Sequence, residues 1–301
     1  MTASALAKRT DNVPLGIAFM IGATILFAIS NAIAKWGSEI YPPGEVIFFR
    51  SYATLLIVMV FVISRRGLDV YRTSIPVAHL ARGLSQSISQ FFTVLALSML
   101  PLAGATAIGF SAPLFSACVA IIFLGERPSV DRLVVLALGF LGVLLVAQPS
   151  ADMPLTGVAF ALANAVMYGS VTVAVRGMSR TESVDTLLMW QVTTVAAFHC
   201  VLLFFGFTPP SAFHLWIFFL CGAANAGAQY LWTRALSLAP ATAVSPFYYM
   251  LLVWSAMIGF VAWGDVPGQG LILGSVVIVA SGVLLIYREA AAKAKSGDVG
   301  R

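Results

Sequence analysis

The chain has 301 residues, of which 60% are hydrophobic and only 10% are charged, and its formal net charge is +5. A soluble domain of this length carries roughly a quarter charged residues, so the composition excludes a water-soluble globular protein. The mean hydropathy of +0.95 and the recurrence of apolar stretches of about twenty residues predict an all-α polytopic membrane protein. Twenty helical residues span about 30 Å, the thickness of the hydrocarbon core of a bilayer.

In chain order, the sequence predicts a cytoplasmic tail over 1–13, ten transmembrane helices and a second cytoplasmic tail over 288–301. The first apolar run is too long for a signal peptide and lacks a small-residue cleavage site, so we expect it to be retained. Turn-forming residues, mainly Pro and Gly, separate the spans. The predicted spans are 14–36, 43–64, 76–99, 101–123, 130–148, 155–176, 183–207, 211–236, 240–263 and 268–287.

The distribution of Lys and Arg predicts the orientation of these spans. With the N-terminus in the cytoplasm, 15 of the 17 basic residues lie on the inner side, and only Lys35 and Arg50 lie toward the outer side. Short cytoplasmic loops are enriched in Lys and Arg, so both termini are predicted to be cytoplasmic. The positive charge then lies beside anionic lipid and requires no nucleic-acid partner.

Short phrases recur about half a chain apart. ALSMLP at 96–101 returns as ALSLAP at 235–240, and the same register aligns Gln90 with Gln229. A single match in apolar sequence would be chance, but several matches in one register indicate an internal repeat.

The repeat predicts two halves of five helices each, over 14–148 and 149–287. The earlier part of each half follows a slightly longer register, which aligns Gly16 with Gly157 and places Arg50 opposite Gln191. Because five is an odd number, the second half crosses the membrane in the opposite sense. Inverted repeats of this kind suit a carrier, since two similar halves can exchange roles and open one cavity alternately to each side.

Polar side chains within the spans form stripes at helical spacing. Gln86 and Gln90 share one face of the third span, and their equivalents in the eighth span are Asn225 and Gln229. Such groups can form interhelical hydrogen bonds or line a water-filled cavity. Their presence in both halves favours a cavity. The predicted substrate-binding residues are Gln86, Gln90, Asn164, Tyr168, Asn225, Gln229, Tyr230, Tyr248, Asn31 and Arg50.

Arg50 lies about two turns inside the outer end of the second span. A lipid-facing arginine there would cost about 2.5–3.5 kcal/mol or more, so the side chain is expected to face protein or a vestibule. It can pair with Glu45, hold a carboxylate of a substrate, or serve a structural role.

Two prolines interrupt predicted spans, Pro113 in the fourth and Pro246 in the ninth. A proline removes a backbone hydrogen bond and bends a helix. Both are therefore predicted hinges, although such bends also occur in purely structural helices.

Several motifs are absent from the sequence. It contains no P-loop, no HExxH and no GxSxG motif, and its cysteines and histidines have no metal-ligand spacing. We therefore predict no cofactor, no metal site, no ATPase partner and no enzymatic activity. No carboxylate lies at mid-span, so strong proton coupling is not indicated.

The chain resembles the drug/metabolite transporter superfamily of the EamA type over about residues 14–287. The likeness rests on FFRSYATLL in the second span, on the segment from ALSMLP to GERPS over 96–129, and on the GVLL phrases at 142–145 and 282–285. Within that family it is most similar to bacterial aromatic amino-acid exporters. The resemblance implies a central cavity lined mainly by spans 1, 3, 4, 6, 8 and 9, with spans 5 and 10 at the periphery.

Together these features predict an inner-membrane exporter of aromatic and other neutral amino acids and related small metabolites, acting by alternating access as a monomer or homodimer. A different cargo is the nearest alternative, namely a nucleotide sugar, a sugar phosphate or a cationic drug. A phosphate would need a basic cluster in the cavity and a cation a buried carboxylate, and the sequence favours neither. An intramembrane enzyme and a non-transporting scaffold are more distant alternatives.

Overall fold

The structure of the chain is a computed structural model that describes residues 12–112, 114–115, 130–146, 153–178, 181–238 and 245–298. The described residues form ten α-helices and three short 3₁₀ helices, with no strand among them, which confirms the all-α prediction. The α-helices are α1 (Val13–Ile40), α2 (Pro43–Arg66), α3 (Pro76–Met99), α4 (Leu102–Gly109), α6 (Val130–Val146), α7 (Leu155–Met178), α8 (Val184–Val201), α9 (Ala212–Leu238), α11 (Met250–Trp263) and α12 (Gln269–Asp298).

The helix ends follow from local sequence. Asn12 caps α1, because its side chain accepts a hydrogen bond from the backbone N–H of Leu15 at 3.2 Å. Pro43 and Pro76 begin α2 and α3, where a missing N–H costs nothing. Gly264 ends α11 in the left-handed conformation, with φ of 72°, which favours glycine.

Most predicted boundaries agree with the helices to within a few residues, but three spans differ. α4 ends at Gly109, inside the span predicted over 101–123. α11 begins only at Met250, after a 3₁₀ turn, inside the span predicted over 240–263. The last span is predicted to end at 287, but α12 continues to Asp298. Its final part, REAAAKAK, is rich in Ala, Glu and Lys, which have high helix propensity in water as well as in lipid. The segment predicted as a tail therefore extends the last helix.

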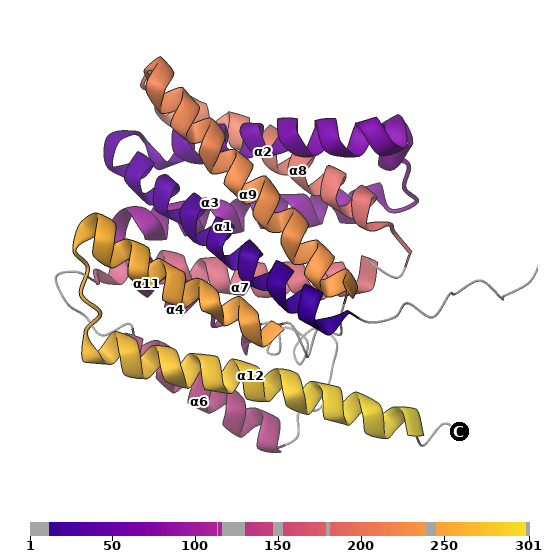
Figure 1. Cartoon of the computed structure of the whole chain (residues 1–301), viewed down its shortest axis with the longest axis vertical. Coiled ribbons are helices and arrows are strands. Elements are labelled where there is room, and N and C mark those ends of the chain that lie inside the picture. Colours follow the sequence, from indigo (N-terminus) through magenta and orange to yellow (C-terminus); the bar gives the residue numbers. More distant parts are fainter. Residues whose placement is uncertain are drawn as a thin grey trace, which may run out of the picture.

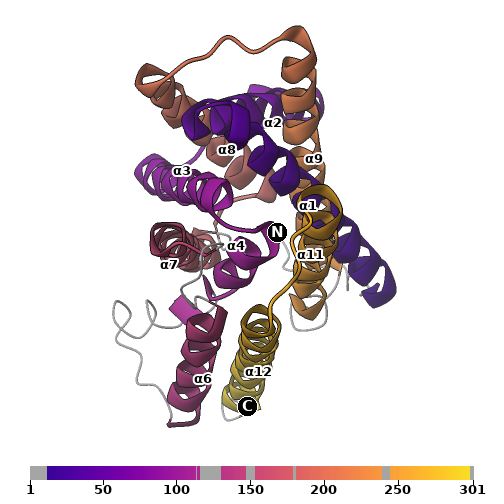
Figure 2. The same cartoon turned by 90° about the vertical axis from the view of Figure 1, so that its left-hand side faces the viewer.

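The helices form layers that Figure 2 shows nearly end-on. In that view α3 and α7 lie together on one side and α1 and α9 on the other, while α2 and α8 cover one end of the bundle. α6 and α12 pair with each other at the opposite end, where they contact α4 (Figures 1 and 2). These two helices correspond to spans 5 and 10, so the expected peripheral position of those spans is confirmed.

The packing of the first five helices has counterparts in the last five. α1 packs on α9 as α7 packs on α3, α2 packs on α9 as α8 packs on α3, and α1 packs on α11 as α7 packs on α4. Each pairing converts into its counterpart when α1, α2, α3 and α4 are exchanged with α7, α8, α9 and α11.

Two glycines allow the closest of these helix contacts. A Cβ atom on Gly83 of α3 would collide with the side chain of Thr194 on α8. A Cβ atom on Gly222 of α9 would collide with Ala53 on α2. The two glycines are repeat equivalents in the later register of the sequence, and their two partners are repeat equivalents in the earlier one. Equivalent small residues thus permit equivalent approaches of the backbones.

The outer surface of the bundle is apolar. Phe204 is 90% exposed, Val261 83% and Val60 69%. Large apolar side chains exposed in such number indicate contact with something other than water. By length and composition, three described segments could cross a bilayer, Val13–Ile40, Pro43–Tyr71 and Asp185–Phe205. A membrane location accounts for both observations.

We expect Gly222→Ala to destabilise the protein. The added methyl group would meet Ala53 and lie 2.8 Å from the backbone oxygen of Arg50. Overpacking of this kind costs about 1–3 kcal/mol, more than the gain of about 1 kcal/mol in helix propensity. The thermal midpoint of the purified variant in detergent should therefore fall.

The matched control is Gly227→Ala in the same helix. There the new Cβ would meet only Cδ1 of Leu26 at 3.0 Å, at the far end of a flexible side chain. Its midpoint should be unchanged or higher. Equal midpoints for the two variants would contradict a tight α2–α9 contact at Gly222.

Candidate functional site

A small polar cavity lies where α2, α3, α8 and α9 meet, and we refer to it as the central polar cavity. Its volume of about 10 Å³ has room for the centre of about one water molecule. Its lining residues are Ser51, Thr54, Gln90, Gln191, Val192, Val195, Asn225 and Gln229. Three of the predicted site residues, Gln90, Asn225 and Gln229, are thereby brought together.

The lining of this cavity follows the internal repeat of the sequence. Gln90 and Gln229 are repeat equivalents in the later register. In the earlier register, Ser51 is equivalent to Val192 and Thr54 to Val195, and all four line the cavity. Equivalent positions of the two halves therefore face each other across one small space.

Arg50 lies beside the cavity on α2 and is only 4% exposed. Its Nη2 donates a long hydrogen bond of 3.4 Å to Oε1 of Gln90, and its Nε has no partner. Among the described residues, no carboxylate oxygen lies within 4.0 Å of this guanidinium. The buried positive charge thus has a neutral neighbour and no counter-ion.

The suggested pairing of Arg50 with Glu45 is wrong. Glu45 is fully buried at the start of α2, where its Oε2 accepts a hydrogen bond from the backbone N–H of Thr208 at 2.8 Å. Glu45 is one turn and a half before Arg50, so the two side chains point to different sides of the helix. Holding a carboxylate of a substrate remains a role that Arg50 can serve.

Hydrogen bonds fix the helices around the cavity. The Nδ2 of Asn225 donates to Oγ1 of Thr54 at 3.2 Å, which ties α9 to α2. Oγ of Ser51 lies 2.6 Å from Nδ1 of His199, and Nε2 of that imidazole donates to the backbone oxygen of Ser87 at 3.2 Å. His199 is 1% exposed and joins three helices, so its role here is structural.

Gln86 is buried on α3, and Asn164 lies on α7, where that helix contacts α3. Oγ of Ser89 donates to Oδ1 of Asn164 at 2.7 Å, and Gln86 is 7% exposed. Neither residue lines the central polar cavity. Gln86 lies one helical turn before the lining residue Gln90 on α3.

The predicted aromatic residues separate into two groups. Tyr248 packs edge-to-face against Phe27 and Phe110, with ring centroids 6.3 and 5.9 Å apart, and Tyr168 is half-buried on α7. Tyr230 is instead 38% exposed and packs against Phe61 at 5.2 Å on the outer side of α2 and α9. The ring of Tyr230 therefore faces away from the other predicted residues.

The remaining predicted residues are Asn31 and the two hinge prolines. Asn31 is half-buried on α1. Pro246 lies in a 3₁₀ turn, Ser245–Tyr249, directly before α11, so the helix geometry changes at this proline. Pro113 lies outside the described residues, although α4 ends nearby at Gly109.

Sequence reasoning missed three polar lining residues, Ser51, Thr54 and Gln191. They lie on α2 and α8, the second and seventh spans, which the family resemblance does not place at the cavity. A signal was available, because Arg50 and Thr54 have the i, i+4 spacing of one helix face and Gln191 is the repeat equivalent of Arg50. In the described part of the chain, no three His, Cys, Asp or Glu side chains are grouped to hold a metal ion.

Apolar helices that enclose a polar centre built from both halves of the chain define a helical membrane protein of the carrier class. The profile of the EamA-like transporter family matches residues 14–148 and again residues 155–288. The chain therefore belongs to the EamA-like transporter family, within the drug/metabolite transporter superfamily.

The sequence similarity to known proteins extends over nearly the whole chain. It is 26% identical to an S-adenosylmethionine uptake transporter of Rickettsia bellii, over 93% of this chain and 96% of that protein. It is 27% identical to a riboflavin transporter of Rhizobium johnstonii, over 96% of each chain. It is 28% identical to a pseudopaline exporter of Pseudomonas aeruginosa, over 91% of this chain and 97% of that protein.

A solved crystal structure has the same fold, with a TM-score of 0.61 at 22% identity, over 91% of this chain and 98% of that chain. The similar proteins are transporters of small metabolites, and they include both uptake and export. The chain is accordingly a metabolite transporter and not an enzyme.

We expect Arg50→Met to stabilise the protein in the absence of substrate. A buried charge without a counter-ion costs several kcal/mol, and methionine fills a similar volume without that cost. The thermal midpoint in detergent should rise by the equivalent of about 1 kcal/mol or more. Stabilisation by an added carboxylate-bearing substrate should be lost.

Arg66→Met is the matched control. Arg66 is 59% exposed and its ion pair with Asp185, at 3.0 Å, contributes about 0–1 kcal/mol at most. Its midpoint should change little. A midpoint of Arg50→Met well below that of Arg66→Met would show that the guanidinium of Arg50 is structural.

Proposed function

We propose that the protein is an inner-membrane carrier that exports amino acids, aromatic and other neutral ones foremost, together with related small metabolites. The observation that supports this function is the central polar cavity, where amides from both halves meet beside a buried arginine that has no counter-ion within 4.0 Å among the described residues. A zwitterionic amino acid offers the two charges that such a site can bind.

Each part of an amino acid has a partner at this site. The carboxylate can accept charge-assisted hydrogen bonds from Arg50, which is held to Gln90 only by a 3.4 Å contact. The ammonium group can donate to the amide oxygens of Gln90 and Gln229. An aromatic side chain can pack against Tyr168 or Tyr248. Asn31, Gln86, Asn164 and Asn225 remain proposed as further polar contacts along the path.

Tyr230 has less support as a binding residue than the other nine, because its ring lies on the outer side of the bundle. Substitution of Tyr230 therefore tests on which side this face of α9 lies. Transport should be lowered if the face lines the path of the substrate and unchanged if it faces outward.

Alternating access is proposed to arise from two inverted repeats, over 14–148 and 149–287. Three observations support the repeats: the exchangeable helix pairings, the equivalent glycines Gly83 and Gly222, and the family profile that matches two successive stretches. Pro113 and Pro246 are the proposed hinges, and both termini are proposed to be cytoplasmic. The carrier would act as a monomer or homodimer.

A different metabolite is the second candidate cargo. The similar proteins named above are described as transporting S-adenosylmethionine, riboflavin or pseudopaline, and one of them acts in uptake. Their variety favours testing these three molecules beside the amino acids, with transport followed in both directions.

The decisive experiment is transport into liposomes that contain the purified protein. A panel of labelled amino acids should show saturable uptake that is unchanged by a pH gradient, since no carboxylate is predicted at mid-span. Protein-free liposomes are the control. If every amino acid fails with folded protein while S-adenosylmethionine, riboflavin or pseudopaline is taken up, the amino-acid proposal is wrong and the carrier class stands.

Gln90→Ala and Gln229→Ala should each lower transport at least about tenfold. Each removes one amide from the central polar cavity and leaves a buried polar group of the substrate unpaired, which costs about 1–3 kcal/mol. Initial rates in liposomes measure this, with folding checked by gel filtration. Gln269→Ala, an exposed amide at the start of α12, should behave as the wild type. Unchanged rates for both cavity variants would refute the site.

A further inference from the structure

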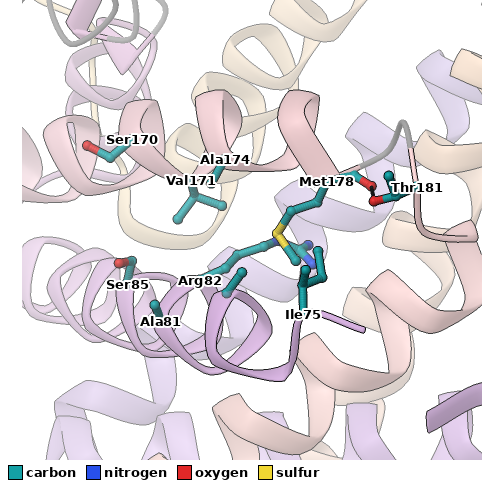
Figure 3. A pocket seen from close by; sticks show the side chains of 10 residues that line it. Ile75, Ala81, Arg82, Ser85, Ser170, Val171, Ala174, Met178 and Thr181 are labelled. Atoms are coloured by element: carbon teal, nitrogen blue, oxygen red, sulfur yellow. Dashed lines mark hydrogen bonds between the residues drawn. The ribbon is translucent and has the colours of Figure 1, made fainter. Parts of the chain in front are cut away.

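A second and much larger cavity lies between α3 and α7, at the end of the bundle where α3 begins and α7 ends. Its volume is about 430 Å³, within the range of small-molecule sites. One wall is apolar, with Ile75, Val171 and Met178 among its residues. Figure 3 shows Arg82 reaching from α3 toward Met178 at the end of α7.

Arg82 is the charged residue of this lining, and it is only 8% exposed. Its Nη1 donates to the backbone oxygen of Leu187 at 3.0 Å, and its Nη2 donates to Oε1 of Gln191 at 2.6 Å. Its Nε is buried and has no hydrogen-bond partner. Among the described residues, no carboxylate oxygen lies within 4.0 Å of this guanidinium either.

Gln191 connects this cavity to the central polar cavity. It accepts the hydrogen bond from Arg82 and also lines the central space, where Gln90 in turn accepts the hydrogen bond from Arg50. Each of the two buried guanidinium groups thus donates to a neutral amide, and both amides line the central polar cavity.

The two arginines occupy related but different places in the two halves. The repeat equivalent of Arg82 is Cys221, which lies near Arg50, and the repeat equivalent of Arg50 is Gln191, which contacts Arg82. Each pair of equivalent positions therefore holds one arginine and one neutral residue. Because the halves are proposed to be inverted, the two positive charges lie toward opposite sides of the membrane.

We propose that the cavity at Arg82 is an entrance site for small amphipathic molecules that carry a carboxylate. The guanidinium attracts the carboxylate, the hydroxyl group of Ser85 can donate a further hydrogen bond, and the apolar wall accepts the rest of the molecule. From there the carboxylate passes by way of Gln191 to Arg50. The passage to Arg50 rests on the proposed function, whereas binding at Arg82 does not.

The position of the cavity agrees with export. Basic residues gather at this end of the bundle, which is predicted to face the cytoplasm, so an exported molecule would enter here. An anionic lipid headgroup presents the same chemistry to Arg82 as a free carboxylate. The experiment must therefore separate these two sources.

The test introduces a reactive thiol into the cavity by Ala81→Cys, since Ala81 is exposed and lines it. The variant is reconstituted in neutral phosphatidylcholine vesicles, and wild-type protein gives the background of the native cysteines. The rate of labelling is measured with a negatively charged methanethiosulfonate and with its positively charged analogue, and the ratio of the two rates is compared with the same ratio for a free thiol in solution. At Ala81→Cys this ratio should be about fivefold higher in favour of the negatively charged reagent.

Added substitutions identify the source of that preference. Arg82→Gln should abolish it, and Arg82→Lys, which keeps the charge, should preserve it. Arg66→Gln removes an exposed positive charge from the same end of the protein and should preserve it as well. If Arg82→Gln does not fold, the preference measured with Ala81→Cys alone and the protection below decide the question.

Protection identifies the ligand. Added 3-phenylpropionate should slow the labelling of Ala81→Cys at least about threefold, and the neutral 3-phenylpropionamide should not. If vesicles with phosphatidylglycerol slow labelling by themselves and 3-phenylpropionate then has no effect, the site belongs to lipid and the proposal is overturned. Absence of both charge preference and protection overturns it too.

These outcomes are independent of amino-acid transport. Protection by 3-phenylpropionate without transport of any amino acid would refute the proposed cargo and leave the entrance site standing. Transport of amino acids without protection or charge preference would refute the entrance site alone.

Discussion

The structure depends on the enclosure of polar side chains inside a bundle whose outside is apolar. A bilayer offers no water to an amide or a guanidinium, so each such group must find its partners within the protein. The partners here are neutral: Arg50 contacts Gln90, and Arg82 contacts Gln191 and a backbone oxygen. Helix packing alone therefore places two buried positive charges where a negative charge can be accepted.

Close backbone approach makes this enclosure possible. Gly83 lets α3 approach α8 and Gly222 lets α9 approach α2, so the four helices meet around one small space. The contacts also draw α2 and α8 into the lining, although the resemblance to the family implies other spans.

A centre of this kind is compatible with several cargoes. Amides can bind donors and acceptors alike, and the aromatic rings of Phe27, Phe110 and Tyr248 form an apolar cluster. The similar proteins transport chemically different metabolites, in uptake and in export. In the described part of the chain, the charged side chains that donate to these amides are Arg50 and Arg82, and we expect selectivity to depend on them.

The sequence by itself determined the helices and their order, because apolar length and Pro or Gly breaks act locally; α3 begins and ends where predicted. Repeated polar positions in apolar helices also predicted Gln90, Asn225 and Gln229 as binding residues, and these three line the central polar cavity. Only the tertiary structure decided that Glu45 does not pair with Arg50, that Tyr230 faces outward, and that Gln191 accepts a hydrogen bond from Arg82 while lining the central polar cavity. Helical periodicity states which residues share a face, but the rotation of each helix against its neighbours decides which face is enclosed.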